Sequence, residues 1–212
     1  MTCCHFPGLE EVFDRKLASR ELEKYRKKGP DKTTRLLVDA IQATGIKDLK
    51  LLDIGGGIGV IQNELLKAGL SHATEVEGSS AYLAAAKEEA ERQSHSNKIS
   101  LLQGDFVDLA KEISATDIVT LDKVICCYPD MESMVRLSAE RAGKIYAVIY
   151  PLDRWWVRLG FRIQNLLFRL KKNPFRFYVH PTQSIEALIR KSGLKRKFYC
   201  KLFMWHVAVY QR

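Results

Sequence analysis

The run from Leu51 to Gly59, Leu-Leu-Asp-Ile-Gly-Gly-Gly-Ile-Gly, constrains the fold of this chain more than any other stretch. An apolar segment ends on the acid Asp53, turns through four glycines and enters a helical pattern. Glycines let the backbone adopt positive φ and approach a ligand closely, and a helix that follows offers unpaired N–H groups. The pattern predicts a nucleotide-like ligand site at the end of a buried strand, although such a turn alone is also compatible with a purely structural role.

The rest of the chain alternates between strand and helix patterns. Strands are expected over 49–54, 73–76, 99–102, 117–121 and 144–150, and the intervening helices over 60–67, 80–93 and 131–141. This alternation predicts an α/β fold with a doubly wound, mostly parallel sheet. Two more strand patterns, 197–202 and 205–210, are separated by only a few residues, so they are expected to form an antiparallel C-terminal hairpin and to complete seven strands.

A single domain spanning 1–212 is expected, because 212 residues with 46% hydrophobic content suit one core. It divides into a helical N-terminal cover (1–45, with helices over 9–28 and 31–43), a central part (46–150), a segment outside the core sheet (151–181) and the end of the sheet (182–212). No apolar run approaches the roughly 20 residues of a membrane span, and Met1 starts no secretory signal. We therefore expect a cytoplasmic protein.

Acidic side chains follow the first four strands. Asp53 ends the first strand, Glu77 the second, Asp105 comes after the third and Asp122 after the fourth. In an open parallel sheet, ligands bind at the carboxyl ends of the strands. A carboxylate at Glu77 can accept hydrogen bonds from ribose hydroxyls, and Asp105 beside Phe106 can meet an adenine; each could also be an ordinary solvated acid.

In this order, the motifs resemble those of class I S-adenosylmethionine-dependent methyltransferases. Residues 52–59 are similar to the first motif, 75–79 to the second-strand acid and its turn, 104–106 to the adenine-side motif and 117–130 to the fourth-strand segment. The resemblance covers roughly residues 30–150. It implies a Rossmann-like methyltransferase fold, S-adenosylmethionine as cofactor, and in-line transfer of a methyl group from the sulfonium to a nucleophile.

The resemblance also implies roles for particular residues. Asp53, with the glycine backbone, would orient the methionine end of the cofactor, and Glu77 would hold the ribose. Asp105 and Phe106 would frame the adenine, while Asp122 would face the methionine or the acceptor. The predicted cofactor-binding residues are Asp53, Gly55, Gly57, Gly59, Glu77, Gly78, Asp105, Phe106 and Asp122, with Tyr25 added from the N-terminal cover.

A small-molecule acceptor, anionic or aromatic, is predicted, with a lid formed by the N-terminal helices and residues 151–181. Residues 176–180 and 122–129 resemble segments of magnesium-protoporphyrin O-methyltransferases, which methylate a carboxylate. The candidate catalytic residues are His180, Asp122 and Tyr128. His180 is the candidate general base because an unperturbed histidine titrates near neutrality, and the alternative is a structural histidine.

Charge is unevenly distributed along the chain. Residues 51–150 carry 9 basic and 15 acidic residues, whereas the flanks carry 25 basic and 10 acidic. Basic flanks indicate an anionic partner or simply favour solubility, so an RNA methyltransferase is the alternative enzyme, and a non-catalytic binding protein with this fold is another. The basic amphipathic helix predicted over 154–170 is compatible with a lid, a membrane-surface contact or a nucleic-acid contact.

Five cysteines include the adjacent pairs Cys3-Cys4 and Cys126-Cys127. Adjacent cysteines do not have the usual C-x₂₋₄-C spacing of zinc ligands, so no metal site is expected. An odd count is also a poor disulfide framework.

Overall fold

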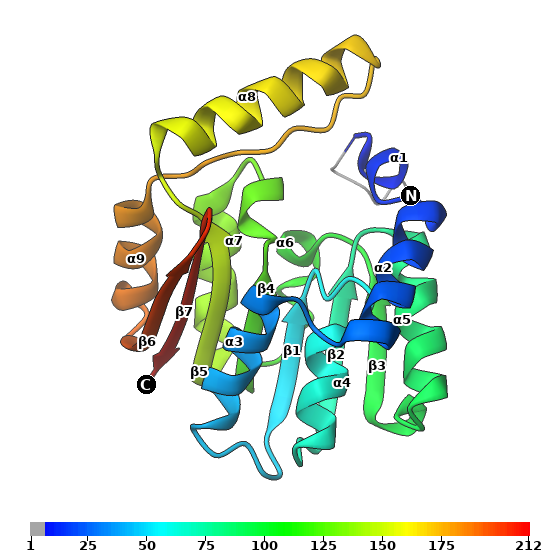
Figure 1. Ribbon diagram of the computed structural model, residues 1–212. Coiled ribbons are helices and arrows are strands. Elements are labelled where there is room, and N and C mark those ends of the chain that lie inside the picture. Colours follow the sequence, from blue (N-terminus) through cyan, green and yellow to red (C-terminus); the bar gives the residue numbers. More distant parts are fainter. Residues whose placement is uncertain (1–6) are drawn as a thin grey trace.

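A computed structural model describes residues 7–212 and contains a seven-stranded sheet of order β3-β2-β1-β4-β5-β7-β6 (Figure 1). β1 to β5 are parallel, and β7 is antiparallel to both of its neighbours. The predicted fold class is therefore confirmed, with β7 between β5 and the edge strand β6. The strands are β1 (Lys50–Ile54), β2 (His72–Glu77), β3 (Ile99–Gln103), β4 (Thr116–Asp122), β5 (Ala142–Pro151), β6 (Lys195–Leu202) and β7 (Trp205–Gln211).

Helices cover both faces of the sheet because successive strand residues point to opposite sides. Leu51 packs with α3 (Lys32–Gln42) and α4 (Val60–Lys67), whereas the next residue, Leu52, belongs to the core cluster of the other face. That face is covered by α6 (Phe106–Leu109), α7 (Met131–Arg141) and α9 (Thr182–Lys191). α5 (Ser80–Arg92) packs beside β2 and β3. The two cores hold the carboxyl ends of β1, β2 and β4 in fixed positions.

The N-terminal cover differs from its prediction as one helix over 9–28. It consists of a short α1 (Leu9–Val12) and a separate α2 (Arg15–Lys28). The carboxylate of Asp14 accepts a hydrogen bond from the Leu17 N–H at 2.8 Å and starts α2 as its N-cap. The apolar periodicity continued through this break, so periodicity alone did not locate it.

Helix α8 (Trp155–Leu170) lies apart from both helical layers. Figure 1 shows it crossing the carboxyl-end side of the sheet, with the irregular segment 171–181 returning beneath it to α9. Val157 is the α8 residue that is fully buried. Within residues 7–212, no helix combines the length and the apolar character needed to cross a membrane.

Candidate active site

A cavity of about 410 Å³ lies at the carboxyl ends of β1, β2 and β4. Its cover comes from the N-terminal part, with Leu9, Phe13 and Pro30 among its lining residues. None of residues 151–181, all of which the structure describes, lines it, so their role as a lid stays a prediction. Of the predicted site residues, the cavity brings together Tyr25, Asp53, Gly55, Gly57, Glu77, Gly78, Asp105, Phe106, Asp122 and Tyr128.

The glycine turn binds the carboxylate of Glu77, the last residue of the next strand. Gly57 has φ of 65°, and its N–H donates to Oε2 of Glu77 at 3.0 Å. The N–H of Ser79 donates to Oε1 of the same carboxylate at 2.8 Å. Burial raises the pKa of Glu77, and these backbone donors partly oppose that shift. Gly59 has φ of 76° and precedes α4 as its N-cap, outside the cavity lining.

Asp53 carries a buried oxygen that lacks a partner. Its Oδ1 accepts a hydrogen bond from the Thr120 hydroxyl at 2.6 Å, but its Oδ2 has no hydrogen-bond partner among residues 7–212. Burial, reinforced by the nearby carboxylates of Asp122 and Glu77, raises the pKa of Asp53 to about 7. A buried carboxylate of this kind is stabilised by a cationic group, and S-adenosylmethionine carries two such groups, so the residues fit the predicted cofactor.

Glu75 lies behind the glycine turn, outside the cavity lining, and was not predicted from the sequence. Its carboxyl is fully buried, accepts a hydrogen bond from Gln62 Nε2 at 2.6 Å, and leaves Oε1 without a partner among residues 7–212. Burial raises the pKa of Glu75 well above its usual value, and the charge of Asp53 adds to the shift. The available signal was an acid inside a strand expected to be buried, which calls for a polar partner.

Tyr128 and Asp105 form a buried pair. The Tyr128 hydroxyl donates to Asp105, with its oxygen 3.0 Å from Oδ2 and 3.2 Å from Oδ1. Asp105 also accepts the Val107 N–H at 2.8 Å, which caps α6. Burial raises the pKa of the Tyr128 hydroxyl, and the neighbouring carboxylate of Asp105 raises it further. The tyrosine therefore stays protonated and acts as a hydrogen-bond donor.

Asp122 belongs to an ion-pair chain that links β4 to α3. Lys123 Nζ lies 3.1 Å from Oδ1 of Asp122 and 2.9 Å from Oδ2 of Asp31, the N-cap of α3. The Thr34 hydroxyl donates to Oδ2 of Asp122. Burial alone would lower the pKa of Lys123, but the two carboxylates outweigh burial and raise it. Asp31, Thr34 and Lys123 were not predicted as site residues, because 92 positions separate Lys123 from Asp31 along the sequence.

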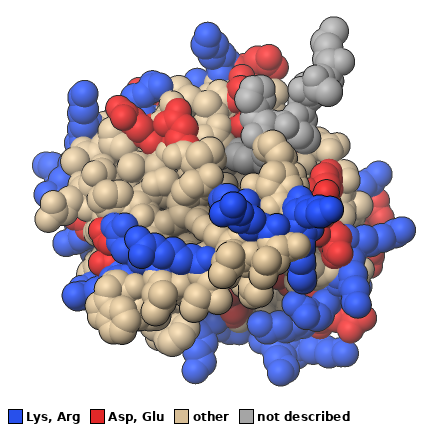
Figure 2. All heavy atoms as spheres, turned by 90° about the horizontal axis from the view of Figure 1, so that it is seen from above, with Lys and Arg blue, Asp and Glu red and all other residues tan. Residues whose placement is uncertain are grey.

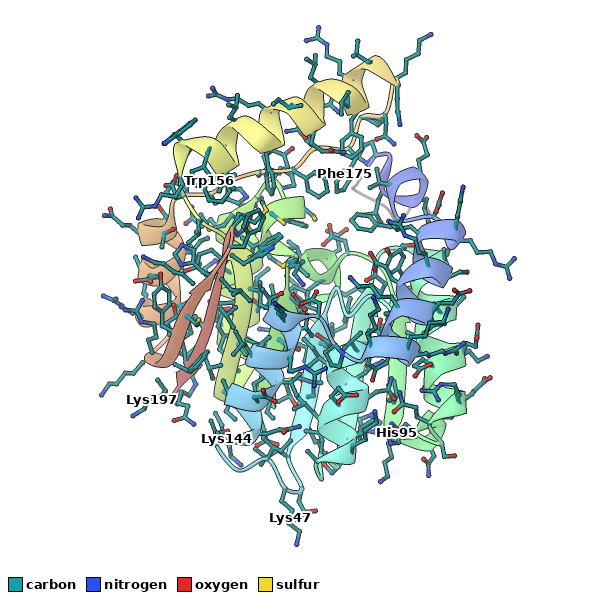
Figure 3. All side chains as sticks on the ribbon, viewed as in Figure 1. Lys47, His95, Lys144, Trp156, Phe175 and Lys197 are labelled. Carbon is teal, nitrogen blue, oxygen red and sulfur yellow. The ribbon has the colours of Figure 1, made fainter. Side chains whose placement is uncertain are left out.

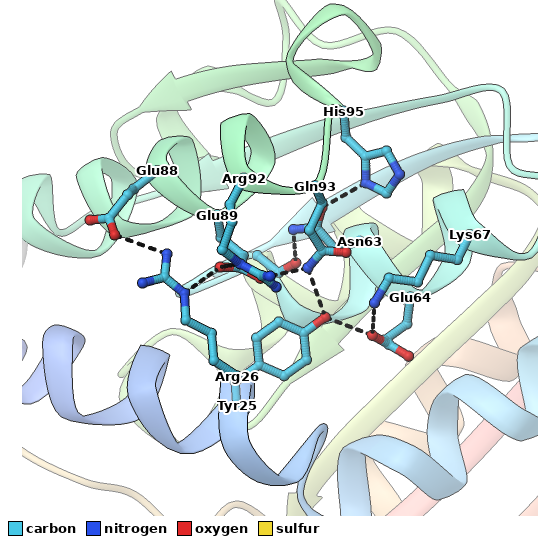
Figure 4. A network of polar contacts seen from close by, with 11 residues as sticks. Tyr25, Arg26, Asn63, Glu64, Lys67, Glu88, Glu89, Arg92, Gln93 and His95 are labelled. Carbon is cyan, nitrogen blue, oxygen red and sulfur yellow. Dashed lines mark hydrogen bonds and ion pairs between the residues drawn. The ribbon is translucent and has the colours of Figure 1, made fainter.

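Tyr25 contributes to the cavity wall from α2, but its hydroxyl points into a network of polar side chains between α2, α4 and α5 (Figure 4). It donates to Glu64 Oε1 at 2.6 Å and accepts from Gln93 Nε2 at 3.4 Å. In the same network, Arg26 pairs with the buried Glu89 at 2.8 Å, which joins α2 to α5. The network thus holds α2 over the cavity.

His180 lies outside the cavity lining. Its Nε2–H donates to the Tyr128 carbonyl at 2.9 Å, and its ring stacks on Tyr178. Burial lowers the pKa of His180. Cys3 and Cys4 fall outside the described residues, and within 7–212 no group of three or more His, Cys, Asp or Glu side chains is arranged to hold a metal ion.

Comparison with known proteins agrees with this site. Residues 52–141 match the model of the methyltransferase domain family. Sequence comparison with curated proteins gave no match. The chain is similar in structure to an O-methyltransferase family protein from Burkholderia thailandensis, with a TM-score of 0.72, 15% identity and coverage of 100% of this chain and 64% of that one. It thus spans slightly less than two thirds of that protein.

Two further structures share the fold. Magnesium protoporphyrin IX methyltransferase from Synechocystis, solved with bound S-adenosylhomocysteine, has a TM-score of 0.68 and 17% identity, with 96% of this chain and 99% of that chain covered. A candidate RNA methyltransferase from Pyrococcus horikoshii has a TM-score of 0.60 and 15% identity, with 84% and 83% covered. The match to a methyltransferase domain over 52–141 and the shared fold agree with the predicted resemblance to S-adenosylmethionine-dependent methyltransferases. The matched stretch includes the glycine turn, Glu77, Asp105 and Asp122.

Proposed function

We propose that this protein transfers the methyl group of S-adenosylmethionine to a small-molecule acceptor. The observation that carries the proposal is that Asp53, Glu77, Asp105 and Asp122, from successive strand ends, line the same cavity as the glycine turn. S-adenosylmethionine supplies a methyl group activated by a positively charged sulfur. The protein then has to hold the acceptor in line with that group, and orientation alone can contribute ~7–11 kcal/mol.

Each carboxylate has a proposed part in binding the cofactor. Asp53 offers its unpartnered Oδ2 to a cation, and Asp122 adds negative charge beside it. Glu77, held by two backbone N–H groups, keeps lone pairs that can accept from ribose hydroxyls. Asp105 and Phe106 lie at the adenine end. Tyr128 orients Asp105 through its hydroxyl, which makes it a positioning residue in this proposal.

The charge of the lining favours a small molecule over RNA. Six acidic side chains line the cavity, against Lys24 and Lys123, and Lys123 is already paired with Asp31 and Asp122. The polyanionic phosphodiester backbone of RNA would be repelled by such a lining. Apolar wall residues, among them Phe13 and Val124, favour an uncharged or aromatic acceptor.

The proposed methyl transfer does not require His180 as a general base. A general base is needed only if the acceptor nucleophile begins protonated, and the Nε2–H of His180 is engaged by the Tyr128 carbonyl outside the cavity. We therefore propose that His180 fixes the 122–128 loop, and that the base, where one is needed, comes from Asp122 or the acceptor itself.

The test combines binding with turnover. Calorimetry should show S-adenosylmethionine binding that the Asp53→Asn variant weakens at least tenfold. Labelled cofactor incubated with a metabolite extract should then label a low-molecular-weight product, and ribonuclease treatment should leave that label unchanged. Label confined to nuclease-sensitive material would favour the RNA alternative, and cofactor binding with no transfer to any extract would favour a non-catalytic binding protein.

A further inference from the structure

Most of the large exposed hydrophobic side chains gather on and beside α8. Among the described residues, nine large hydrophobic side chains are exposed, and eight of them lie on α8 or at the adjacent tip of the β6–β7 hairpin. We call the exposed hydrophobic residues of 155–170, together with Phe203, the α8 surface. Its most exposed members are Trp155 (75%), Leu170 (72%) and Phe203 (79%). Exposed apolar patches of this extent mark interaction sites.

The α8 surface faces away from the rest of the protein. At about 100° per residue, its α8 members fall within an arc of about 120° on the helix. The opposite side carries Phe161 and Phe168, whose rings lie 5.5 and 5.7 Å from the ring of Phe177. Helix α8 therefore has two apolar faces: the inner one packs on segment 171–181, and the outer one is exposed. Phe203 extends the outer face, with its ring 5.8 Å from that of Trp156.

Positive charge borders this apolar face. Arg158, Arg162 and Arg169 fall together along one edge of the apolar arc at helical spacing, and α8 itself contains no acidic residue. Across 151–181 the chain has seven basic residues and one acid, Asp153, which pairs with Arg158 at 2.7 Å. Figure 2, viewed from the α8 end, shows a mainly uncharged surface crossed and bordered by lysine and arginine side chains.

We propose that the α8 surface docks into the headgroup region of an anionic lipid bilayer, with α8 lying in the membrane plane. A helix with an apolar face, tryptophan at its start and arginines beside that face has the composition of an interfacial helix. Long arginine side chains can extend to phosphates while the apolar side chains enter the acyl boundary. Sixteen residues span only about 24 Å, which is too short to cross the roughly 30 Å hydrocarbon core.

A second copy of this chain fits the α8 surface less well. Antiparallel packing of two α8 surfaces would place both rows of arginines on the same side, and in either orientation neither helix has an acid to neutralise them. Phosphate headgroups supply the missing negative charge. The charge pattern therefore favours anionic lipid as the occupant.

Docking in this way turns the cavity side of the molecule toward the bilayer. Figure 1 places α8 on the carboxyl-end side of the sheet, where the cavity lies. The inner face of α8 connects to the cavity wall through aromatic rings: Phe168 contacts Phe175 at 6.0 Å, and Phe175 contacts Phe13, a lining residue, at 5.6 Å. The docking proposal does not depend on which acceptor is methylated.

Sedimentation of the full chain with vesicles tests the proposal. The protein should bind equimolar phosphatidylcholine–phosphatidylglycerol vesicles, and bind phosphatidylcholine alone more weakly. The triple variant Leu159→Ser, Ile163→Ser, Leu166→Ser should bind at least about tenfold more weakly, because it loses apolar burial. Each side chain is about half exposed, so the melting temperature should fall only modestly, through lost helix propensity and partial burial, and circular dichroism should show the helix content retained. Arg162→Gln with Arg169→Gln should weaken binding to the anionic vesicles by about fivefold per residue.

Matched controls come from elsewhere on the chain. Leu102→Ser removes the ninth exposed hydrophobic residue, which lies on β3. Lys47→Gln with Lys144→Gln removes two charges at the end of the molecule opposite α8 (Figure 3). Both control variants should bind anionic vesicles as the unmodified chain does.

Three outcomes would overturn the proposal. One is vesicle binding that the triple variant leaves unchanged, or no vesicle binding at all. Another is a dimer, seen by light scattering without vesicles, that the triple variant abolishes; it would assign the α8 surface to a second copy. The third is RNA binding that needs Arg162 and Arg169 but tolerates the triple variant, together with absent vesicle binding.

Discussion

Glu75 fills the space that a side chain at Gly56 would need. A Cβ atom on Gly56 would lie 2.8 Å from Cγ and Cδ of Glu75 and 3.0 Å from Oδ2 of Asp53. Gly56→Cys should therefore destabilise the fold by about 1–3 kcal/mol, since overpacking forces buried groups apart. Urea denaturation measures this change in the free energy of unfolding.

The same pair allows a double-mutant test. Glu75→Ala removes the obstructing carboxyl, so Gly56→Cys should cost clearly less in that background than in the unmodified chain. Gly160→Ala is the control, because a Cβ at Gly160 meets no atom within 4 Å. An equal cost of Gly56→Cys in both backgrounds would show that Glu75 does not occupy the space in solution.

Asp53→Asn should raise the stability of the fold and weaken the binding of S-adenosylmethionine. Burial raises the pKa of Asp53 to about 7, whereas the unfolded value is about 3.9. The folded state holds the proton more tightly, so this group's contribution to stability is present below about pH 4 and is lost as pH rises to about 7. Asparagine cannot ionise and its Oδ1 can still accept from Thr120. At pH 8 the variant should therefore be more stable, by on the order of a few kcal/mol, yet bind S-adenosylmethionine at least tenfold more weakly.

Denaturation curves at pH 5 and pH 8, with calorimetry at pH 8, measure the two effects of Asp53→Asn. The stability gain should shrink at pH 5, where the carboxyl of the unmodified chain is protonated. A variant with an unchanged pH dependence of stability would contradict the raised pKa of Asp53.

Lys123→Met should remove the cation that joins β4 to α3. Asp122 and Asp31 would face each other without it, at a cost of about 1–2 kcal/mol for a pair that is only partly buried. The positive charge of Lys123 lowers the pKa of Asp31, so this stabilisation is present above the unfolded pKa of Asp31 and is lost as the pH falls toward its lower folded pKa. The loss caused by Lys123→Met should therefore be fully present near pH 7 and should shrink progressively as the pH falls below about 4. Thermal denaturation across this range measures it.

The exposed pair of Lys27 and Glu23 provides the control for that measurement. Both side chains are largely exposed at an Nζ–Oε2 distance of 3.7 Å, so Lys27→Met should change stability by less than about 0.5 kcal/mol at any pH. If Lys123→Met changed stability as little as Lys27→Met does, the ion-pair chain would not stabilise the contact between α3 and β4.

The sheet and the acids at its strand ends were predictable because each depends on a short stretch of sequence. An apolar run, a glycine turn and an acid such as Asp53 or Glu77 carry their own signal, and parallel strands bring their carboxyl ends to one edge. The placement of β7 between β5 and β6 was open, because a hairpin can join a sheet by either strand.

The partners of those acids were not predictable from local pattern. Lys123 reaches Asp31 across 92 positions, and Tyr128 reaches Asp105 across 23. Such contacts follow from how elements pack, and periodicity records only that an element has a buried face. Apolar periodicity also does not show whether a face is covered. The apolar spacing of the outer face of α8 resembles that of a helix packed on a core, yet this face is exposed.

His180→Gln should leave the pH dependence of methyl transfer unchanged, although histidine is the side chain expected to titrate near neutrality. Burial lowers the pKa of His180, so the ring is neutral above about pH 6.5, and its Nε2–H holds the Tyr128 carbonyl at 2.9 Å. A glutamine amide can donate the same hydrogen bond, whereas the alanine of His180→Ala cannot. His180→Ala should therefore lose about 1–2 kcal/mol of stability by leaving that carbonyl unpaired.

The profile of kcat/KM against pH separates a structural role of His180 from a role as general base. A structural histidine predicts the same profile in both variants, with a lower melting temperature only for His180→Ala. Loss of one limb of the profile in His180→Gln would instead make His180 the general base, and would require its ring to reach the cavity during turnover.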